Sequence, residues 1–160
     1  MSTEKMKVHT YNPTIRWTGN RGEGTTGYAD YDRSHLLLID GKTHIPCSSD
    51  PAFRGDNSKH NPEDLFVASI SSCHMLWYLH LCADAGVIVT AYTDRPVGKL
   101  QEGGDQPGFI SELTLNPTVT VKHPDMAEKA RELHHIAGEK CFLANSLNFK
   151  VKYSPVIEIA

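Results

Sequence analysis

The sequence contains four cysteines, and their positions decide which of them can take part in chemistry. Cys73 and Cys82 fall within one predicted helix, nine residues apart, so the second points about 180° away from the first. These two thiols therefore cannot share a site. Cys82 is surrounded by Leu79, Leu81 and Ala83, a setting typical of an inert buried thiol, and we predict a structural role for it.

Cys47 follows His44 by three residues, a spacing that occurs in metal-ligand pairs. One such pair is weak evidence, because a closed zinc site needs four ligands and the sequence has no CxxC pair. We predict that Cys47 is a solvated or half-buried loop thiol. His134, His135 and Cys141 could complete such a site only by a coincidence of folding. A metal-binding protein that uses Cys73, Cys141 and nearby histidines is an alternative of a different class.

Cys73 stands among small polar residues that interrupt an otherwise apolar helix, namely Ser69, Ser71, Ser72 and His74. A polar stripe within a buried helix favours a shielded pocket. A packed core thiol explains the same residues equally well. His74 points about 100° away from Cys73 on the helix, and we expect a solvated or structural role for it.

A reactive thiol acts as a thiolate, so the environment of Cys73 must favour negative charge. Cys73 lies too deep in its helix for the N-terminal dipole to help much. A nearby cation is therefore required. Arg21 and Arg54, each in a glycine-containing loop that allows a close backbone approach, are the two candidates.

The elements that must position these residues begin with strands over residues 1–46. Alternating aromatic and β-branched residues predict strands at 8–17 and 25–31, and Asp40-Gly41 between two apolar runs predicts a hairpin. Residues 47–60 contain turn formers and charge without periodicity, so we expect a surface loop there.

A helix over residues 61–85 carries Cys73. A good N-cap residue, a proline at the first helical position and two acidic residues open it, at Asn61–Asp64, and Gly86 supplies the stop. Its residues are apolar or small almost all round, which is typical of a helix buried between layers. We expect it at the centre of the molecule.

The C-terminal half continues with a long antiparallel hairpin over 87–121. A helix region over 124–146 follows, in which Gly138 breaks an amphipathic helix before the turn that carries Cys141. Residues 149–159 close the chain as a strand. The order βββ-α-ββ-α-β predicts an α+β fold, and we expect a single domain.

Composition excludes several classes of function. A chain of 160 residues with 39% hydrophobic and 22% charged residues is suited to one globular domain. Its net charge of −3 provides no basic stripe, so we expect no nucleic-acid partner. Neither a long uninterrupted apolar run nor a signal peptide is apparent, so we expect a cytoplasmic protein without a membrane partner.

The residues around Cys73 resemble a known family signature. Asn61–Ala68 followed by Ser71–Cys73 resembles the NPE-(x)-L-(x)-A-A…C motif of the OsmC/Ohr family, the osmotically inducible and organic hydroperoxide resistance proteins. Trp17–Gly19 with Arg21–Thr25 resembles that family's N-terminal strand and arginine loop, and Cys141 its second cysteine. The resemblance covers essentially the whole chain. It implies an antiparallel sheet wrapped around buried central helices.

The same resemblance implies thiol-dependent reduction of organic hydroperoxides and hydrogen peroxide, in defence against oxidative stress. Cys73 would be the attacking thiol and Cys141 the resolving one, with Arg21 as activating cation and Glu63 as the carboxylate that orients it. Arg54 remains the other candidate for contact with the substrate. A dithiol or lipoyl-type reductant would regenerate the thiols, and no bound cofactor or metal is implied.

Elementary chemistry agrees with these roles. Attack on a peroxide by a thiolate leaves sulfenic acid and an alkoxide or hydroxide, which arginine stabilises without losing its charge. Phe66, Ile70 and Trp77 near the Cys73 face would form an apolar wall suited to an alkyl hydroperoxide. A non-enzymatic binding protein, in which the central helices line an apolar pocket, is the second alternative.

The predicted helix also indicates an assembly. Glu63 and Cys73 are ten residues apart on it, about 15 Å along its axis, so they cannot serve one site within one chain. A helix that is apolar on all sides needs more cover than one such chain offers. We therefore predict an intertwined homodimer whose sites are shared between subunits.

Overall fold

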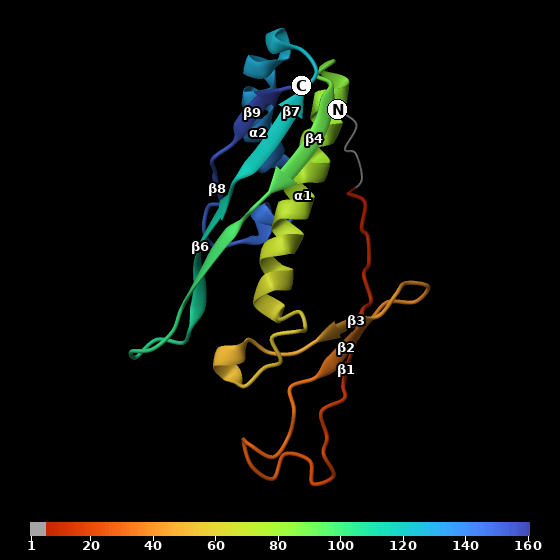
Figure 1. The fold of residues 1–160 in the computed structure, drawn as a ribbon, viewed down its shortest axis with the longest axis vertical. Helices are drawn as coiled ribbons and strands as arrows, with labels where there is room; N and C mark the ends of the chain where they lie inside the picture. The colour runs from red at the N-terminus through yellow and green to blue at the C-terminus, as the bar shows by residue number, and fades with distance from the viewer. Residues whose placement is uncertain (1–5) are drawn as a thin grey trace. The chain divides into compact units, whose positions relative to one another are not determined.

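The computed structural model describes residues 6–160, which form two compact units. The first unit runs up to Pro62, and the second unit is Glu63–Ala160. Figure 1 shows the order of the elements along the chain. The second unit carries both Cys73 and Cys141, whereas Arg21 and Arg54 belong to the first.

The first unit contains a three-stranded antiparallel sheet in the order β1-β2-β3. Its strands are β1 (Thr14–Trp17), β2 (His35–Leu38) and β3 (Ile45–Cys47). The predicted hairpin is confirmed: the amide of Lys42 donates to the carbonyl of Ile39 over 3.0 Å, and Gly41 adopts a φ of +75°.

Residues 25–31 do not form the expected strand, and that prediction is wrong. They lie in a loop whose carbonyl groups bond to arginine side chains instead of a neighbouring strand. The guanidinium of Arg33 donates to the carbonyls of Tyr28 and Tyr31, each over 2.6 Å, and stacks on both rings. Carbonyl groups that accept these hydrogen bonds are not available to pair with a neighbouring strand.

The expected loop over 47–60 begins one residue too early, since Cys47 ends β3. A short 3-10 helix, η1 (Pro51–Phe53), interrupts the loop and is capped by the Asp50 side chain, which accepts from the amide of Ala52 over 2.7 Å. Arg54 follows with a φ of +64°, the only non-glycine residue with positive φ among residues 6–160.

Helix α1 (Pro62–Asp84) matches the predicted helix to within a residue at each end, and Gly86, with a φ of +72°, follows it. Its buried residues recur with helical spacing, at Ile70, Ser71, His74, Tyr78 and Cys82. By length and composition alone α1 could cross a membrane. The core helix of a water-soluble protein meets the same criteria, so this is weak evidence for a membrane segment.

The predicted hairpin over 87–121 is confirmed, and it is interrupted in the middle. Strand β4 (Val89–Asp94) pairs with β7 (Pro117–Val121), and β5 (Val97–Gln101) pairs with β6 (Phe109–Leu115), both antiparallel. At the interruption Asp94 accepts hydrogen bonds from the amide of Asn116, over 2.7 Å, and from the hydroxyl of Ser71. This carboxylate therefore ties α1 to the hairpin.

The C-terminal region begins with η2 (Pro124–Met126) and α2 (Ala127–Lys140), and a turn with η3 (Ala144–Ser146) follows. Gly138 does not break the helix as expected, because it lies inside α2. A Cβ atom at Gly138 would lie 2.8 Å from the phenol oxygen of Tyr153. The glycine therefore makes room for a neighbouring ring rather than ending the helix.

The expected C-terminal strand is present as two short strands, β8 (Lys152–Tyr153) and β9 (Val156–Ile159). They pair parallel to β6 and β7 respectively, so the sheets of the second unit are mixed rather than purely antiparallel. Figure 1 shows α1 running along these sheets. One core joins α1 and α2 to β7, and a smaller one joins α1 to β6.

Candidate active site

The fold brings Cys73 and Cys141 together, although they are far apart in the sequence. Cys73 is half-buried on α1, and Cys141 is fully buried just after the end of α2. The two thiols lie within hydrogen-bonding reach of each other. The pKa of Cys141 is raised to about 11. Burial is the main cause, followed by the hydrogen bond with Cys73 and the charge of Cys73.

The turn after α2 holds the Cys141 side chain in place. The helix ends at Lys140, and Cys141 takes an extended backbone conformation. The amide of Ala144 donates to the Cys141 sulfur over 3.5 Å, and the amide of Asn145 donates to its carbonyl over 3.0 Å. The backbone thus fixes the direction in which the thiol points.

This arrangement gives the two thiols different roles. Because its pKa is raised, Cys141 keeps its proton at neutral pH and can donate a hydrogen bond to the Cys73 sulfur. Cys73 is the more exposed of the two sulfurs. Cys73 is therefore the sulfur that a reagent in solvent can reach, with the protonated thiol of Cys141 beside it.

A buried histidine pair lies directly behind Cys73. His74 and His134 are both almost completely buried, and His74 Nε2 is 3.0 Å from His134 Nδ1. Burial lowers the pKa of His74 to about 4, and burial with the charge of His74 lowers the pKa of His134 to about 3. Both rings are neutral at pH 7. Of the two roles expected for His74, the structural one is observed.

Tyr153 joins the two helices beside the thiols, and sequence analysis missed it. Its ring stacks on His74 with centroids 4.6 Å apart, and its phenol oxygen lies over Gly138 on α2. Burial, followed by the charges of Cys141 and Cys73, raises the pKa of Tyr153 to about 12. The one signal in the sequence was a glycine inside an amphipathic helix, which can indicate close approach by another group.

The three residues of the expected apolar wall are divided between two cores, with Phe66 and Ile70 in one and Trp77 in the other. Ile70 is 1% exposed and packs with Phe66 in the smaller core, so its surface is already used. Trp77, one helical turn after Cys73, meets Phe142 edge to face with centroids 5.6 Å apart. Trp77 and Phe142 therefore form an aromatic pair close in sequence to the two thiols.

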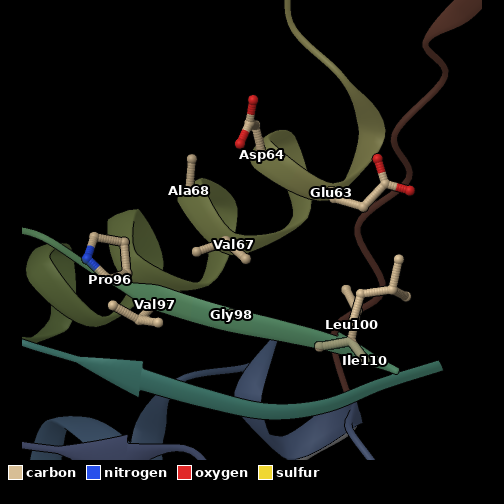
Figure 2. Close-up of a pocket in the computed structure, with 9 residues that line it drawn as sticks. All are labelled: Glu63, Asp64, Val67, Ala68, Pro96, Val97, Gly98, Leu100 and Ile110. Carbon is tan, nitrogen blue, oxygen red and sulfur yellow. The ribbon is translucent and has the colours of Figure 1, made fainter. Parts of the chain in front are cut away.

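Glu63, the predicted orienting carboxylate, lies at the start of α1 beside a cavity of about 520 Å³. Its Oε2 atom is buried and has no hydrogen-bond partner among residues 6–160. In Figure 2 Val67 lies between α1 and β5, and a Cβ atom at Gly98 would be only 2.6 Å from this valine. A second cavity, of about 730 Å³, is lined by residues that include Gly138 and Tyr153.

Glu63 and Cys73 are separated along one unbroken helix. The rise of an α-helix places them about 15 Å apart along its axis. The structure therefore does not bring the carboxylate of Glu63 to the thiol of Cys73 within this helix.

The two candidate arginines differ in how they are held within the first unit. The guanidinium of Arg21 donates to the carbonyls of Ala29 and Asp30 and lies 3.8 Å from a carboxylate oxygen of Asp32. Arg54 has its guanidinium 5.9 Å from the ring centroid of Tyr28. The activating role of either arginine toward Cys73 remains a prediction.

The other two cysteines are buried. Cys82 lies in the larger core with 1% exposure, as expected, and burial raises its pKa. Cys47 is also 1% exposed, so the prediction of a solvated or half-buried thiol is wrong; its thiol donates to the carbonyl of Ile45 over 3.5 Å. Among residues 6–160, no group of three or more histidine, cysteine or acidic side chains is arranged to hold a metal ion.

Comparison with known proteins adds to this geometry. Residues 55–155 match the family model described as "OsmC-like protein". A search of curated proteins returned no match. The chain is similar to a solved OsmC-like protein of unknown function from Vibrio cholerae, at 29% identity and a TM-score of 0.83, covering 93% of this chain and 100% of that one.

Two further solved structures share the fold at lower identity. An organic hydroperoxide resistance protein from Elizabethkingia anophelis is 17% identical with a TM-score of 0.70, covering 98% of this chain and 100% of that one. An organic hydroperoxide resistance protein from Legionella pneumophila is 15% identical with a TM-score of 0.64, covering 94% and 99%.

Proposed function

The chain belongs to the OsmC-like protein family, and from that premise we propose that it reduces hydroperoxides with Cys73 as the attacking thiol and Cys141 as the resolving thiol. The observation that carries this proposal is the pairing of a half-buried thiol with a fully buried one at hydrogen-bonding reach. The names of the Elizabethkingia and Legionella relatives support the choice of organic hydroperoxides as substrates.

The proposed reaction begins when the Cys73 thiolate attacks one peroxide oxygen and breaks the O–O bond. Cys73 becomes a sulfenic acid, and the alkoxide leaves as an alcohol after taking a proton. Cys141 then attacks the Cys73 sulfur, and its proton leaves with the hydroxide as water. An external dithiol reduces the resulting disulfide by two electrons and restores both thiols.

The proposed site needs a cation and is completed by a second subunit. Arg21 would stabilise the thiolate and the leaving oxyanion, and Glu63 would orient this arginine. Since α1 separates Glu63 from Cys73, the carboxylate and the thiol of one site would come from different chains of a homodimer. The buried, unpartnered oxygen of Glu63 supports a missing partner at that position.

Two aromatic residues give the proposed site an apolar side. Trp77 packs against Phe142, whose side chain is 70% exposed, next to the turn that holds Cys141. Their rings would accept the alkyl part of a substrate, so we expect cumene hydroperoxide to react faster than hydrogen peroxide.

The test is dithiol-dependent turnover of both peroxides. Wild-type protein should consume cumene hydroperoxide in the presence of dithiothreitol, and Cys73→Ser should abolish turnover. Cys82→Ser is the matched control, because its thiol lies on the same helix but in the core, and it should keep activity. Wild-type turnover no faster than that of Cys73→Ser would refute the enzyme and favour a binding protein that uses the cavities of the second unit.

A further inference from the structure

Tyr153 occupies the space between the two helices that carry the thiols. One face of its ring lies on His74, the neighbour of Cys73 on α1. Its phenol oxygen lies over Gly138, which precedes Cys141 by three residues on α2. Residues three apart share one face of a helix. The phenol oxygen therefore lies near the C-terminal end of α2, on the face where Cys141 follows the helix.

The ring is held from both sides. His74 cannot retreat, because its own ring bonds to His134, which in turn stacks on Tyr78 with centroids 3.8 Å apart. On the other side, the absence of a side chain at Gly138 lets the phenol come within van der Waals distance of the helix backbone. A group fixed in this way loses little conformational freedom when it makes a hydrogen bond.

We propose that the phenol of Tyr153 donates a hydrogen bond to the thiolate formed by the Cys73–Cys141 pair, and so acts as a catalytic residue of this site. A phenol is a suitable donor, because it carries one O–H group and stays neutral beside a negative sulfur. The charges of both cysteines contribute to keeping it protonated. The role of Tyr153 in peroxide reduction rests on the proposed function, whereas the hydrogen bond itself can be measured without any peroxide.

The chemical consequence concerns both the acidity and the redox potential of the thiols. A hydrogen bond to a charged group of this kind should lower the pH midpoint of thiolate formation by about one to two units. The bond would favour the thiolate over the thiol. It would also favour the reduced pair over the disulfide, which offers the phenol no negative charge.

The decisive experiment measures thiolate formation in wild type and Tyr153→Phe. The pH dependence of iodoacetamide labelling, or of absorbance at 240 nm, gives the pH midpoint of the reactive dithiol. Tyr153→Phe keeps the stacked ring and removes only the hydroxyl, so it should raise this midpoint by at least about one unit. Equilibration with dithiothreitol should show the disulfide becoming about tenfold harder to reduce, a shift of ~30 mV to lower potential.

Tyr92→Phe is the matched control. The Tyr92 hydroxyl is also buried, and its ring belongs to the same aromatic cluster, 5.8 Å from Tyr78. The charge that acts on it is that of Asp94 rather than that of a cysteine. This variant should leave both the midpoint and the potential unchanged. Equal shifts in Tyr92→Phe and Tyr153→Phe would overturn the proposal.

Gly138→Ala provides a second route to the same interaction. The new methyl group would lie 2.8 Å from the phenol oxygen and so displace it, and the variant should reproduce most of the midpoint shift. Its far-UV circular dichroism spectrum should match that of the wild type, which separates this shift from a loss of folding. In the Tyr153→Phe background it should add little, because the bond is already lost. An unchanged midpoint in Tyr153→Phe rules out the hydrogen bond, whereas absent peroxide turnover with a shifted midpoint rules out only the proposed function.

Discussion

At the scale of single residues, burial separates the cysteines into different chemical types. Cys47 and Cys82 are each 1% exposed. Cys47 lies at the end of β3 in the first unit, and Cys82 lies in the larger core of the second unit. Cys141 is equally buried but has another thiol within reach, and Cys73 is accessible. Reactivity toward an oxidant should follow this division.

Oxidation with one equivalent of hydroperoxide should link Cys73 to Cys141 and leave Cys47 and Cys82 reduced. The expected reason is that the latter two are each only 1% exposed, so an oxidant in solvent does not reach them. Peptide mapping after alkylation of free thiols provides the measurement. A principal disulfide that contains Cys47 would contradict the assignment.

The two arginines should not be equivalent. We predict that Arg21→Ala slows the reaction of Cys73 with peroxide more than Arg54→Ala does, by about a hundredfold or more, the usual cost of losing an oxyanion donor. The bonds from Arg21 to the carbonyls of Ala29 and Asp30 fix its guanidinium within its loop. Stopped-flow rates for the two variants give the ranking. A larger loss in Arg54→Ala would assign the activating charge to the loop after η1.

At the scale of elements, the sequence predicted what local signals control. The capping residues at Asn61–Asp64 and Gly86 set the bounds of α1, and Asp40-Gly41 set the β2–β3 hairpin. The strand expected at 25–31 was wrong because Arg33 bonds to carbonyl groups of this segment, a local side-chain effect that the alternation of residue types does not report.

The candidate site could be predicted only in part. The family-like residues led to Cys73 and Cys141, and the structure brings these two together. Tyr153 and the His74–His134 pair could not be found, because packing between α1, α2 and β8 determines them. Gly138 was interpreted as a helix stop for the same reason: its partner ring is distant in sequence.

The histidine pair between α1 and α2 should make the protein sensitive to acid. The pKa values of about 4 and about 3 in the folded chain are below the ordinary value of 6.5, so the unfolded chain binds more protons below pH 6.5. The contribution of the pair to the free energy of unfolding is fully present above pH 6.5. It is lost as the pH falls, by up to about 1.4 kcal/mol per pH unit for each histidine.

Urea unfolding at pH 7, 6 and 5 measures this loss. The double variant His74→Phe/His134→Leu should flatten the decline, even if its stability at pH 7 is lower. His80→Gln/His135→Gln is the control, because both of these side chains are mostly exposed and should leave the slope unchanged. An equal slope in the wild type and the core double variant would exclude the pair as its cause.

At the scale of the whole molecule, the proposed homodimer can be tested by complementation. Glu63→Ala and Cys73→Ser chains should each be inactive, and mixing them under conditions of subunit exchange should restore up to about a quarter of wild-type activity. The reason is that a random heterodimer contains one site with both residues intact. No recovery despite proven exchange would mean that each site is built within one chain.

Helix α1 presents a face that the chain itself does not cover. Leu76, in the middle of the helix, is 61% exposed, whereas its neighbours Met75 and Trp77 are half-buried. If a second copy covers this face, folding and association become one equilibrium governed by mass action. The melting temperature should then rise with protein concentration, and Leu76→Asp should lower it and remove the concentration dependence. Dilution alone would destabilise such a protein, so its cellular abundance would help to determine the fraction that is folded.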